Sequence, residues 1–158
     1  MVGSEFGVLR VDGRLVTIMV DFNNISAYDS PPPDDMSSNK DRAIRRLGPI
    51  YDLDEIKLAA KQRIFPATRK CSEDIQRLGF DLGDVCDLIQ KLSKSDYRKS
   101  MWCTTSGNGA NVVACDDYRI EIRHLNASEF KLEMVEYYLK FGLGKKGNLL
   151  LMVSCHPA

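Results

Sequence analysis

Residues 78–101 read LGFDLGDVCDLIQKLSKSDYRKSM, and this stretch predicts a short helix that leads directly into a β-strand. Asp81 is placed to cap the helix, because its carboxylate can accept hydrogen bonds from the free N–H groups of the first turn. Apolar residues then recur at spacings of three and four, the pattern of one buried helical stripe. They are Leu82, Val85, Cys86, Ile89 and Leu92. The strand opens with a phenol, a guanidinium and an ammonium on Tyr97, Arg98 and Lys99, a combination that attracts anions.

Two further helices are expected upstream of this stretch. Asp52 can cap the first. Its apolar face would hold Leu53, Ile56 and Ala60. This helix should end before Pro66, because a proline pushes the residue ahead of it out of the helical region. Residues 67–71 are expected to be extended, and Ser72 is expected to cap a second helix over residues 73–78.

At least four strands follow, separated by turn residues. By pattern they span residues 97–104, 112–123, 130–141 and 149–155, with a break or bulge left open at residues 115–117. Because side chains alternate across a strand, the third strand should have one core face and one outer face. The core face would hold Val135, Tyr137, Leu139 and Phe141. The outer face would hold Glu136, Tyr138 and Lys140. Helices followed by neighbouring strands predict an α+β fold, a small antiparallel sheet with the N-terminal helices packed on one face.

Residues 1–35 differ in composition from the rest of the chain. A hairpin signal lies at Asp12-Gly13 between two β-rich runs, and a stiff, proline-rich linker follows and ends just before Met36. We therefore expect an N-terminal extension over residues 1–35 and a folded domain over residues 36–158. Two interpretations of the extension stay open. It is either a tag or fusion ahead of a start at the methionine, or an extra hairpin that adds to the sheet or shields the site.

The composition suits a single compact domain, with 158 residues of which 44% are hydrophobic. No apolar run approaches the roughly 20 residues of a membrane-spanning helix, and no secretory signal is visible, so we expect a soluble cytoplasmic protein. Five irregularly spaced cysteines favour reduced, mostly buried thiols over a disulfide framework or a zinc site. Residues 1–35 hold two basic and six acidic residues, and the remainder holds 20 basic and 16 acidic ones. The larger part is thus mildly basic, which suits a phosphate-bearing partner.

The chain has no phosphate-binding glycine loop, no zinc-protease motif and no nucleophile-elbow motif. The polar candidates for chemistry lie on three predicted strands and are Lys99, Tyr138, Lys140 and His156. Ordinary solvated sheet residues would explain them. They also suit metal-free RNA cleavage, in which a 2′-hydroxyl attacks the adjacent phosphate and needs a proton acceptor, a proton donor and cations. His156 could accept or donate a proton, and Tyr138 could position the phosphate or donate a proton. Lys99 and Arg98 would stabilise the negative charge.

Residues 78–86 and 92–101 resemble the MqsR family of bacterial toxins. Members of that family carry a similar Leu-Gly-Leu/Phe-Asp helix and a Leu-Ser-x-Ser-Asp-Phe/Tyr-x-Lys-Ser-Met segment. Residues 117–119 and 137–140 add to the resemblance, which extends over about residues 51–156. The N-terminal part of the chain lies outside it.

The resemblance implies a RelE-like fold and a toxin of a type II toxin–antitoxin system that cleaves mRNA at selected sequences, without a metal ion or another cofactor. It also implies a cognate antitoxin that neutralises the toxin, binds operator DNA and contains zinc. No membrane partner is implied. Two alternatives stay open. One is a non-catalytic module that binds RNA or the antitoxin in repression, and the other is a toxin that residues 7–29 mask as a built-in inhibitor.

The resemblance also assigns roles by position. The family's catalytic lysine corresponds to Lys99 and its tyrosine to Tyr138. A second family lysine falls at His156, which could do the same work as an acid or base. A family glutamine falls at Cys115, whose thiol cannot replace the hydrogen bonds of an amide. The residues expected to bind RNA are Arg98, Lys140, Tyr97 and Arg119.

Overall fold

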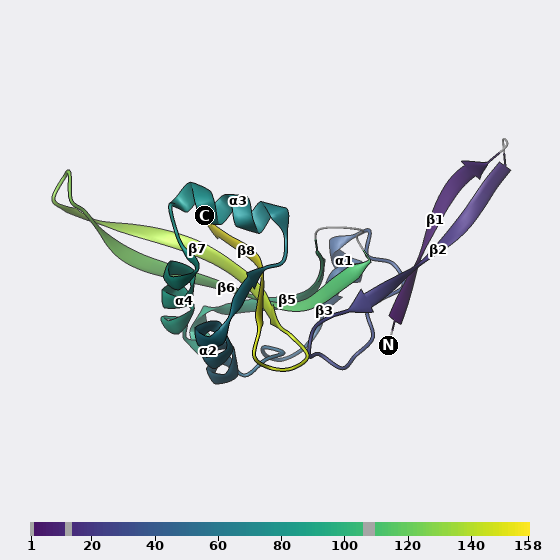
Figure 1. The fold of residues 1–158 in the computed structure, drawn as a ribbon, viewed down its shortest axis with the longest axis horizontal. Coiled ribbons are helices and arrows are strands. Elements are labelled where there is room, and N and C mark those ends of the chain that lie inside the picture. Colours follow the sequence, from purple (N-terminus) through teal and green to yellow (C-terminus); the bar gives the residue numbers. More distant parts are fainter. Residues whose placement is uncertain (1, 12–13, 106–109) are drawn as a thin grey trace.

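The computed structural model describes residues 2–11, 14–105 and 110–158, with side chains described from residue 22 onward (Figure 1). The helices are α1 (Asn39–Arg42), α2 (Leu53–Gln62), α3 (Arg69–Leu78) and α4 (Leu82–Gln90), with a 3-10 turn, η1 (Lys94–Asp96). The strands are β1 (Val2–Val11), β2 (Arg14–Asn24), β3 (Ala43–Ile44), β4 (Ile64–Pro66), β5 (Tyr97–Thr104), β6 (Asn111–Asn126), β7 (Lys131–Leu143) and β8 (Leu150–Pro157). The turn expected at residues 12–13 lies outside the described residues, as do residues 106–109 between the first two predicted strands.

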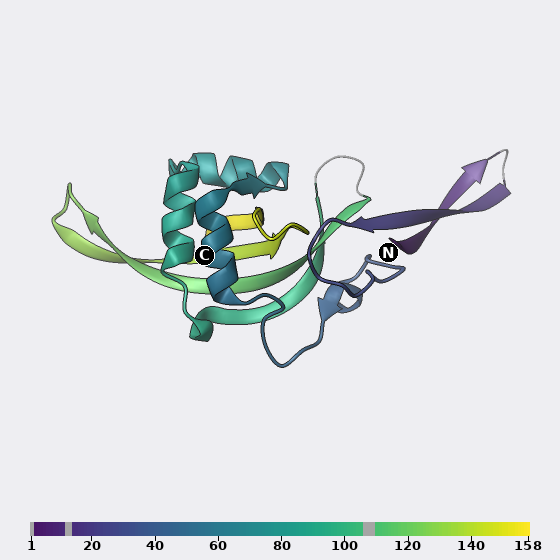
Figure 2. The ribbon, with the colours of Figure 1, turned by 60° about the horizontal axis from the view of Figure 1, so that its bottom comes forward.

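One mixed sheet organises the molecule. Its strands follow the order β1-β2-β6-β7-β8-β4, and β5 pairs with β6 and with β3. The long ladders that join β5, β6, β7 and β8 are antiparallel, whereas β4 pairs with β8, and β2 with β6, over short parallel stretches. Helices α2, α3 and α4 pack together against the sheet (Figures 1 and 2). The predicted α+β fold, with helices on one face of a mostly antiparallel sheet, is confirmed.

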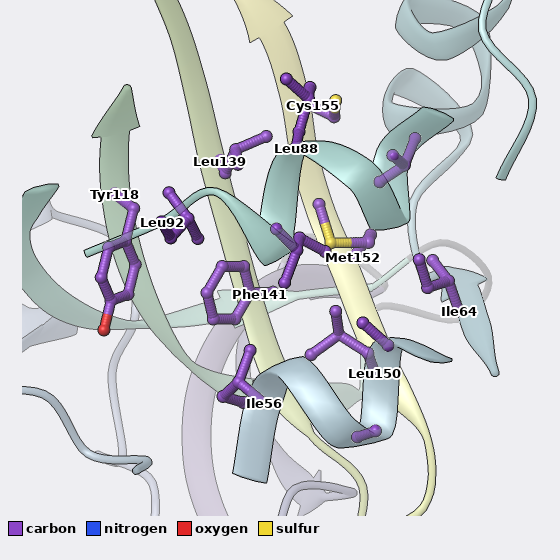
Figure 3. Packing of buried hydrophobic residues seen from close by; sticks show 14 of the residues in the cluster. Ile56, Ile64, Leu88, Leu92, Tyr118, Leu139, Phe141, Leu150, Met152 and Cys155 are labelled. Carbon is purple, nitrogen blue, oxygen red and sulfur yellow. The ribbon is translucent and has the colours of Figure 1, made fainter. Parts of the chain in front are cut away.

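The main core fills the space between these helices and the sheet (Figure 3). The helices contribute Ile56, Ile75, Val85, Leu88 and Ile89. The sheet contributes Tyr118, Leu139, Phe141, Leu150 and Met152. The expected alternation along β7 is confirmed, because Tyr137, Leu139 and Phe141 are buried in this core while Tyr138 and Lys140 on the opposite face are only half-buried. In the described part of the chain, no helix is long and apolar enough to cross a membrane.

Carboxylates fix where α2 and α4 begin. Asp52 accepts a 2.8 Å hydrogen bond at the start of α2. Asp81 and Asp84 form a capping box at the start of α4, in which each side chain accepts from the other's backbone N–H. The predicted stripe on α4 is buried at Val85, Ile89 and Leu92. The prediction that Leu82 is buried in this stripe is wrong. Leu82 occupies the first helical position and is 43% exposed, and the stripe is completed by Leu88, which is 4% exposed.

The start of α3 was also predicted wrongly. Thr68 caps the helix, because its Oγ1 accepts a 3.0 Å hydrogen bond from the N–H of Cys71. The same hydroxyl donates to the carbonyl of Val153 in β8 at 3.0 Å, a tertiary contact that holds the cap in place. Residues 69–71, expected to be extended, are therefore helical, and Ser72 lies inside the first turns.

The sheet irregularities lie elsewhere than expected. β6 runs without a break through residues 115–117, and the register shifts instead between Tyr97 and Lys99 on β5. A second shift lies in the pairing of β7 with β8, after Lys140. Next to it, a Cβ on Gly142 would lie 2.6 Å from a carbonyl oxygen of β6, so the close approach of these strands requires glycine.

Residues 22–36 close one end of the helix-side face of the sheet. Phe22 and Met36 are buried against Trp102 of β5. Ser26 is also buried and accepts a 3.0 Å hydrogen bond from the backbone of β6. We call residues 22–36 the strap. Before it, β1 and β2 form an antiparallel hairpin, as predicted, which projects away from the rest of the molecule (Figures 1 and 2).

Candidate functional site

Two rows of side chains cross the sheet on the face opposite the helices. In the first row, Lys99 of β5 pairs with Asp117 of β6, and Asp117 pairs with Lys140 of β7. Directly paired residues point to the same face, so the carboxylate lies between two lysine positions. The register shift in β5 brings Arg98 to the same place, where its guanidinium lies 3.9 Å from a carboxylate oxygen of Asp117.

The second row lies one step further along the strands. Arg119 of β6 pairs with Tyr138 of β7, and Tyr138 pairs with His156 of β8. The rings of Tyr138 and His156 lie 5.7 Å apart. Together the two rows form one surface, which we call the basic face. It comprises Arg98, Lys99, Asp117, Arg119, Tyr138, Lys140 and His156.

Tyr138 is the centre of this surface. The Arg98 guanidinium lies over its ring, 5.1 Å from the ring centre, and the Arg119 guanidinium lies at 6.0 Å. Both distances allow a cation–π attraction. Arg119 also forms an ion pair with Glu136 of β7. Two guanidinium groups are therefore held close to one phenol by contacts with carboxylates.

His156 lies at the end of β8, beside α3. It is half-buried, and its Nδ1 lies 2.9 Å from the carbonyl oxygen of Pro157. A 2.7 Å hydrogen bond from Lys70 lowers the pKa of Asp74 on α3, and the charge of His156 acts in the same direction. The imidazole therefore lies within the field of this carboxylate as well as beside Tyr138.

Tyr97 is the one expected site residue that points to the helix side of the sheet. It pairs with Tyr118, and the two rings meet edge to face with centres 5.7 Å apart. A 2.7 Å hydrogen bond joins its hydroxyl to Ser100, which in turn donates to the buried carboxylate of Asp116. Tyr97 is thus built into the core edge and is not part of the basic face.

A hollow of about 550 Å³ nevertheless connects Tyr97 to two arginines of the basic face. It follows the edge of β6 beyond the end of β5, where β6 loses its partner strand. It is lined by Lys91, Ser95, Asp96, Tyr97, Arg98, Arg119, Ile120, Glu121 and Ile122. A flat ligand could therefore contact Tyr97 and the arginines at once.

Cys115 lies on the same sheet face as Lys140 but is fully buried in a small apolar cluster. Burial raises the pKa of its thiol, so the sulfur stays protonated at neutral pH. All five cysteines are free, and all are buried except Cys86, which is half-buried; the prediction of reduced, mostly buried thiols is confirmed. Among the described residues, no three His, Cys, Asp or Glu side chains are grouped as metal ligands.

Asp117 is a member of the site that was not predicted. Residues 112–118 of β6 are all buried, and two adjacent carboxylates within such a run are unusual. The side chain of Asp116 points to the helix side of the sheet, where it accepts hydrogen bonds from the backbone N–H groups of Ile50 and Tyr51 at 2.9 and 3.0 Å. Strand alternation then sends Asp117 to the opposite face, and this alternation is the signal that could have identified it.

Cations and aromatic rings gathered on an open sheet face are features with which proteins bind single-stranded nucleic acids. A family model described as motility quorum-sensing regulator, toxin of MqsA, matches residues 48–156, and the chain belongs to this family. It is therefore a toxin of a toxin–antitoxin system, and the family implies a cognate antitoxin, MqsA. A search of the curated proteins and a search of the solved structures found no match. The strap and the hairpin before it lie outside the matched residues.

Proposed function

We propose that the protein is a metal-independent, sequence-selective mRNA endoribonuclease. The observation that supports this most directly is the convergence of Lys99, Tyr138 and His156 on one sheet face, although they come from three different strands. Metal-free phosphodiester cleavage requires a proton acceptor, a proton donor and cations, and these three residues offer an imidazole, a phenol and an ammonium for those roles.

In this reaction the 2′-oxygen of a ribose forms a bond to the adjacent phosphorus, and the bond from phosphorus to the 5′-oxygen breaks. The products are a 2′,3′-cyclic phosphate and a free 5′-hydroxyl. One group takes the proton of the 2′-hydroxyl and another gives a proton to the departing 5′-oxygen. His156 accepts the proton of the 2′-hydroxyl, and its neighbour Tyr138 donates a proton to the departing 5′-oxygen. Lys99 stabilises the negative charge that builds up on the phosphate oxygens.

RNA binding falls to the cations around these groups. Arg98, Arg119 and Lys140 would contact successive phosphates across β5, β6 and β7, since they lie on the same face as the reacting groups. Tyr97 lines the hollow at the edge of β6, where an unstacked base could lie against its ring. The protein partner would be a zinc-containing, DNA-binding antitoxin.

The first test is cleavage of mixed RNA by the purified protein in the presence of a metal chelator. The proposed enzyme cuts under these conditions, whereas a non-catalytic binding module only shifts the mobility of the RNA. Sequencing of the fragment ends then gives the cleavage sequence.

Lys99→Ala should abolish both RNA cleavage and growth inhibition, with a rate loss of at least about 100-fold, because a fixed cation beside the phosphate is removed. Lys61→Ala is the matched control, since Lys61 is an exposed lysine near the end of α2. Thermal unfolding of both variants should match that of the parent. Full toxicity of a well-expressed Lys99→Ala variant would contradict the role given to Lys99.

A further inference from the structure

The carboxylate of Asp117 is enclosed by cations on the basic face. Its side chain is 8% exposed, and it lies between the positions of Lys99 and Lys140 in the strand register. Arg98 forms its ion pair, at 3.9 Å. Burial raises the pKa of Asp117, while Lys140, Arg98 and Lys99 act in the opposite direction.

A buried carboxylate next to a phosphate-binding surface needs an explanation. Ion pairs of this kind contribute little net stability, because the desolvation of both charges offsets their attraction. The carboxylate also repels the phosphates that the surface is suited to bind. We therefore expect the carboxylate to have a role in the site that outweighs both its desolvation cost and its repulsion of phosphates.

Asp116 shows how a purely structural carboxylate looks in the same strand. Both of its oxygens accept hydrogen bonds, from two backbone N–H groups at 2.9 and 3.0 Å and from the Ser100 hydroxyl at 2.6 Å. These bonds tie the start of α2 to β6. Asp117, one residue later, instead faces three cationic side chains of the proposed site, and its partner Arg98 lies against the ring of Tyr138.

We propose that Asp117 is the positioning residue of the basic face. Its carboxylate holds the Arg98 guanidinium over Tyr138 and offsets the mutual repulsion of Lys99 and Lys140. It thereby fixes the geometry in which the tyrosine and the lysine meet the scissile phosphate. This inference rests on the proposed function, because it assigns a residue to the same reaction.

The effect on catalysis separates positioning from simple charge. If Asp117 acted only through its charge, its neutralisation would strengthen RNA binding and leave the rate unchanged or raised. If it positions Arg98 and Tyr138, Asp117→Asn should lower kcat by at least about tenfold, while the Kd for a non-cleavable 2′-O-methyl RNA stays within about threefold or becomes tighter. Asp87→Asn, which removes an exposed carboxylate from α4, is the charge-matched control and should change neither value.

A readout without RNA distinguishes failure of this inference from failure of the proposed function. In a protein with ¹³C-labelled tyrosine, the Tyr138 ring resonance should shift in Asp117→Asn and stay in place in Asp87→Asn. A parent protein that does not cleave RNA, together with a shifted Tyr138 resonance, would overturn the proposed function and leave the contact between Asp117, Arg98 and Tyr138 supported.

The inference itself fails if the parent cleaves RNA and Asp117→Asn keeps both its kcat and its Tyr138 resonance. It also fails if Asp87→Asn loses as much activity as Asp117→Asn. Should the asparagine variant not fold, Asp117→Thr provides the same comparison, because a β-branched polar side chain suits a strand and carries no charge. The expected kcat loss and resonance shift are the same for this variant.

Discussion

His156 differs from a lysine in one respect that matters for proton transfer. An imidazole changes its charge close to neutral pH, whereas an ammonium stays charged throughout the physiological range. It also lies beside Tyr138 and within the field of Asp74, so the phenol and the imidazole can act on the same phosphate. A histidine at this position links the proposed reaction to pH in a way that a lysine would not.

The pH–rate profile of RNA cleavage should therefore carry an inflection that comes from the charge change of an imidazole. His156→Lys should shift or abolish this inflection. The control is His124→Gln, because His124 is the chain's other histidine and is joined to Tyr137 by a 2.9 Å hydrogen bond on the helix side of the sheet. If the inflection is still present in His156→Lys, His156 does not transfer a proton in the reaction and is only a residue at the rim of the site.

Individual residues also show where sequence patterns fall short. Alternation along β7 correctly separated the core positions from Tyr138 and Lys140, because the pairing of β7 with β6 is regular around these two residues. It could not reveal the register shift in β5, which leaves Tyr97 facing the core while Arg98 and Lys99 both serve the basic face. A bulge depends on the partner strand and therefore leaves no mark in a local pattern.

At the scale of elements, helix starts could be predicted where the cap is purely local. The caps of α2 and α4 depend on side chains that bond to their own first turn. At α3, Thr68 and Ser72 both have the right chemistry, and the choice is made by the bond from Thr68 to β8. β4 was not predicted either, because it also depends on a tertiary contact. Its three residues include a proline and form a strand only by pairing with β8.

The corrected face of α4 gives a direct stability test. Leu88→Ala should lower the free energy of unfolding by about 2 to 5 kcal/mol, because it removes a buried side chain and leaves a cavity. Leu82→Ala changes the same residue type six positions earlier, where the side chain is 43% exposed, and should cost less than about 1 kcal/mol. Denaturant titration measures both. Equal losses would mean that the first turn of α4 is packed more closely than it is in this structure.

At the scale of the whole molecule, Phe22 and Met36 of the strap pack on the face of β5 and β6 opposite the basic face, and only Ile25 among the packed strap side chains lies beside the buried Cys115 cluster on the other face. Trp102, which packs with the strap, alternates along β5 with Lys99 and Met101, which point to the open side. The strap therefore stabilises the sheet mainly by packing on its helix side. This arrangement argues against masking of the site by the strap and for its role as part of the core.

Two truncations separate these roles. Removal of residues 1–21 leaves Phe22 and the strap in place and should leave the midpoint of thermal unfolding within a few degrees of the parent. Removal of residues 1–36 exposes Trp102 and β6, deletes the buried side chains of Phe22 and Met36 among others, and should lower the midpoint by at least about 10 °C. RNA cleavage per folded molecule should be the same for the shorter truncation as for the full chain. A clear rise in cleavage after removal of residues 1–21 would instead show that the hairpin inhibits the site, and an unchanged midpoint after removal of residues 1–36 would show that the strap is dispensable.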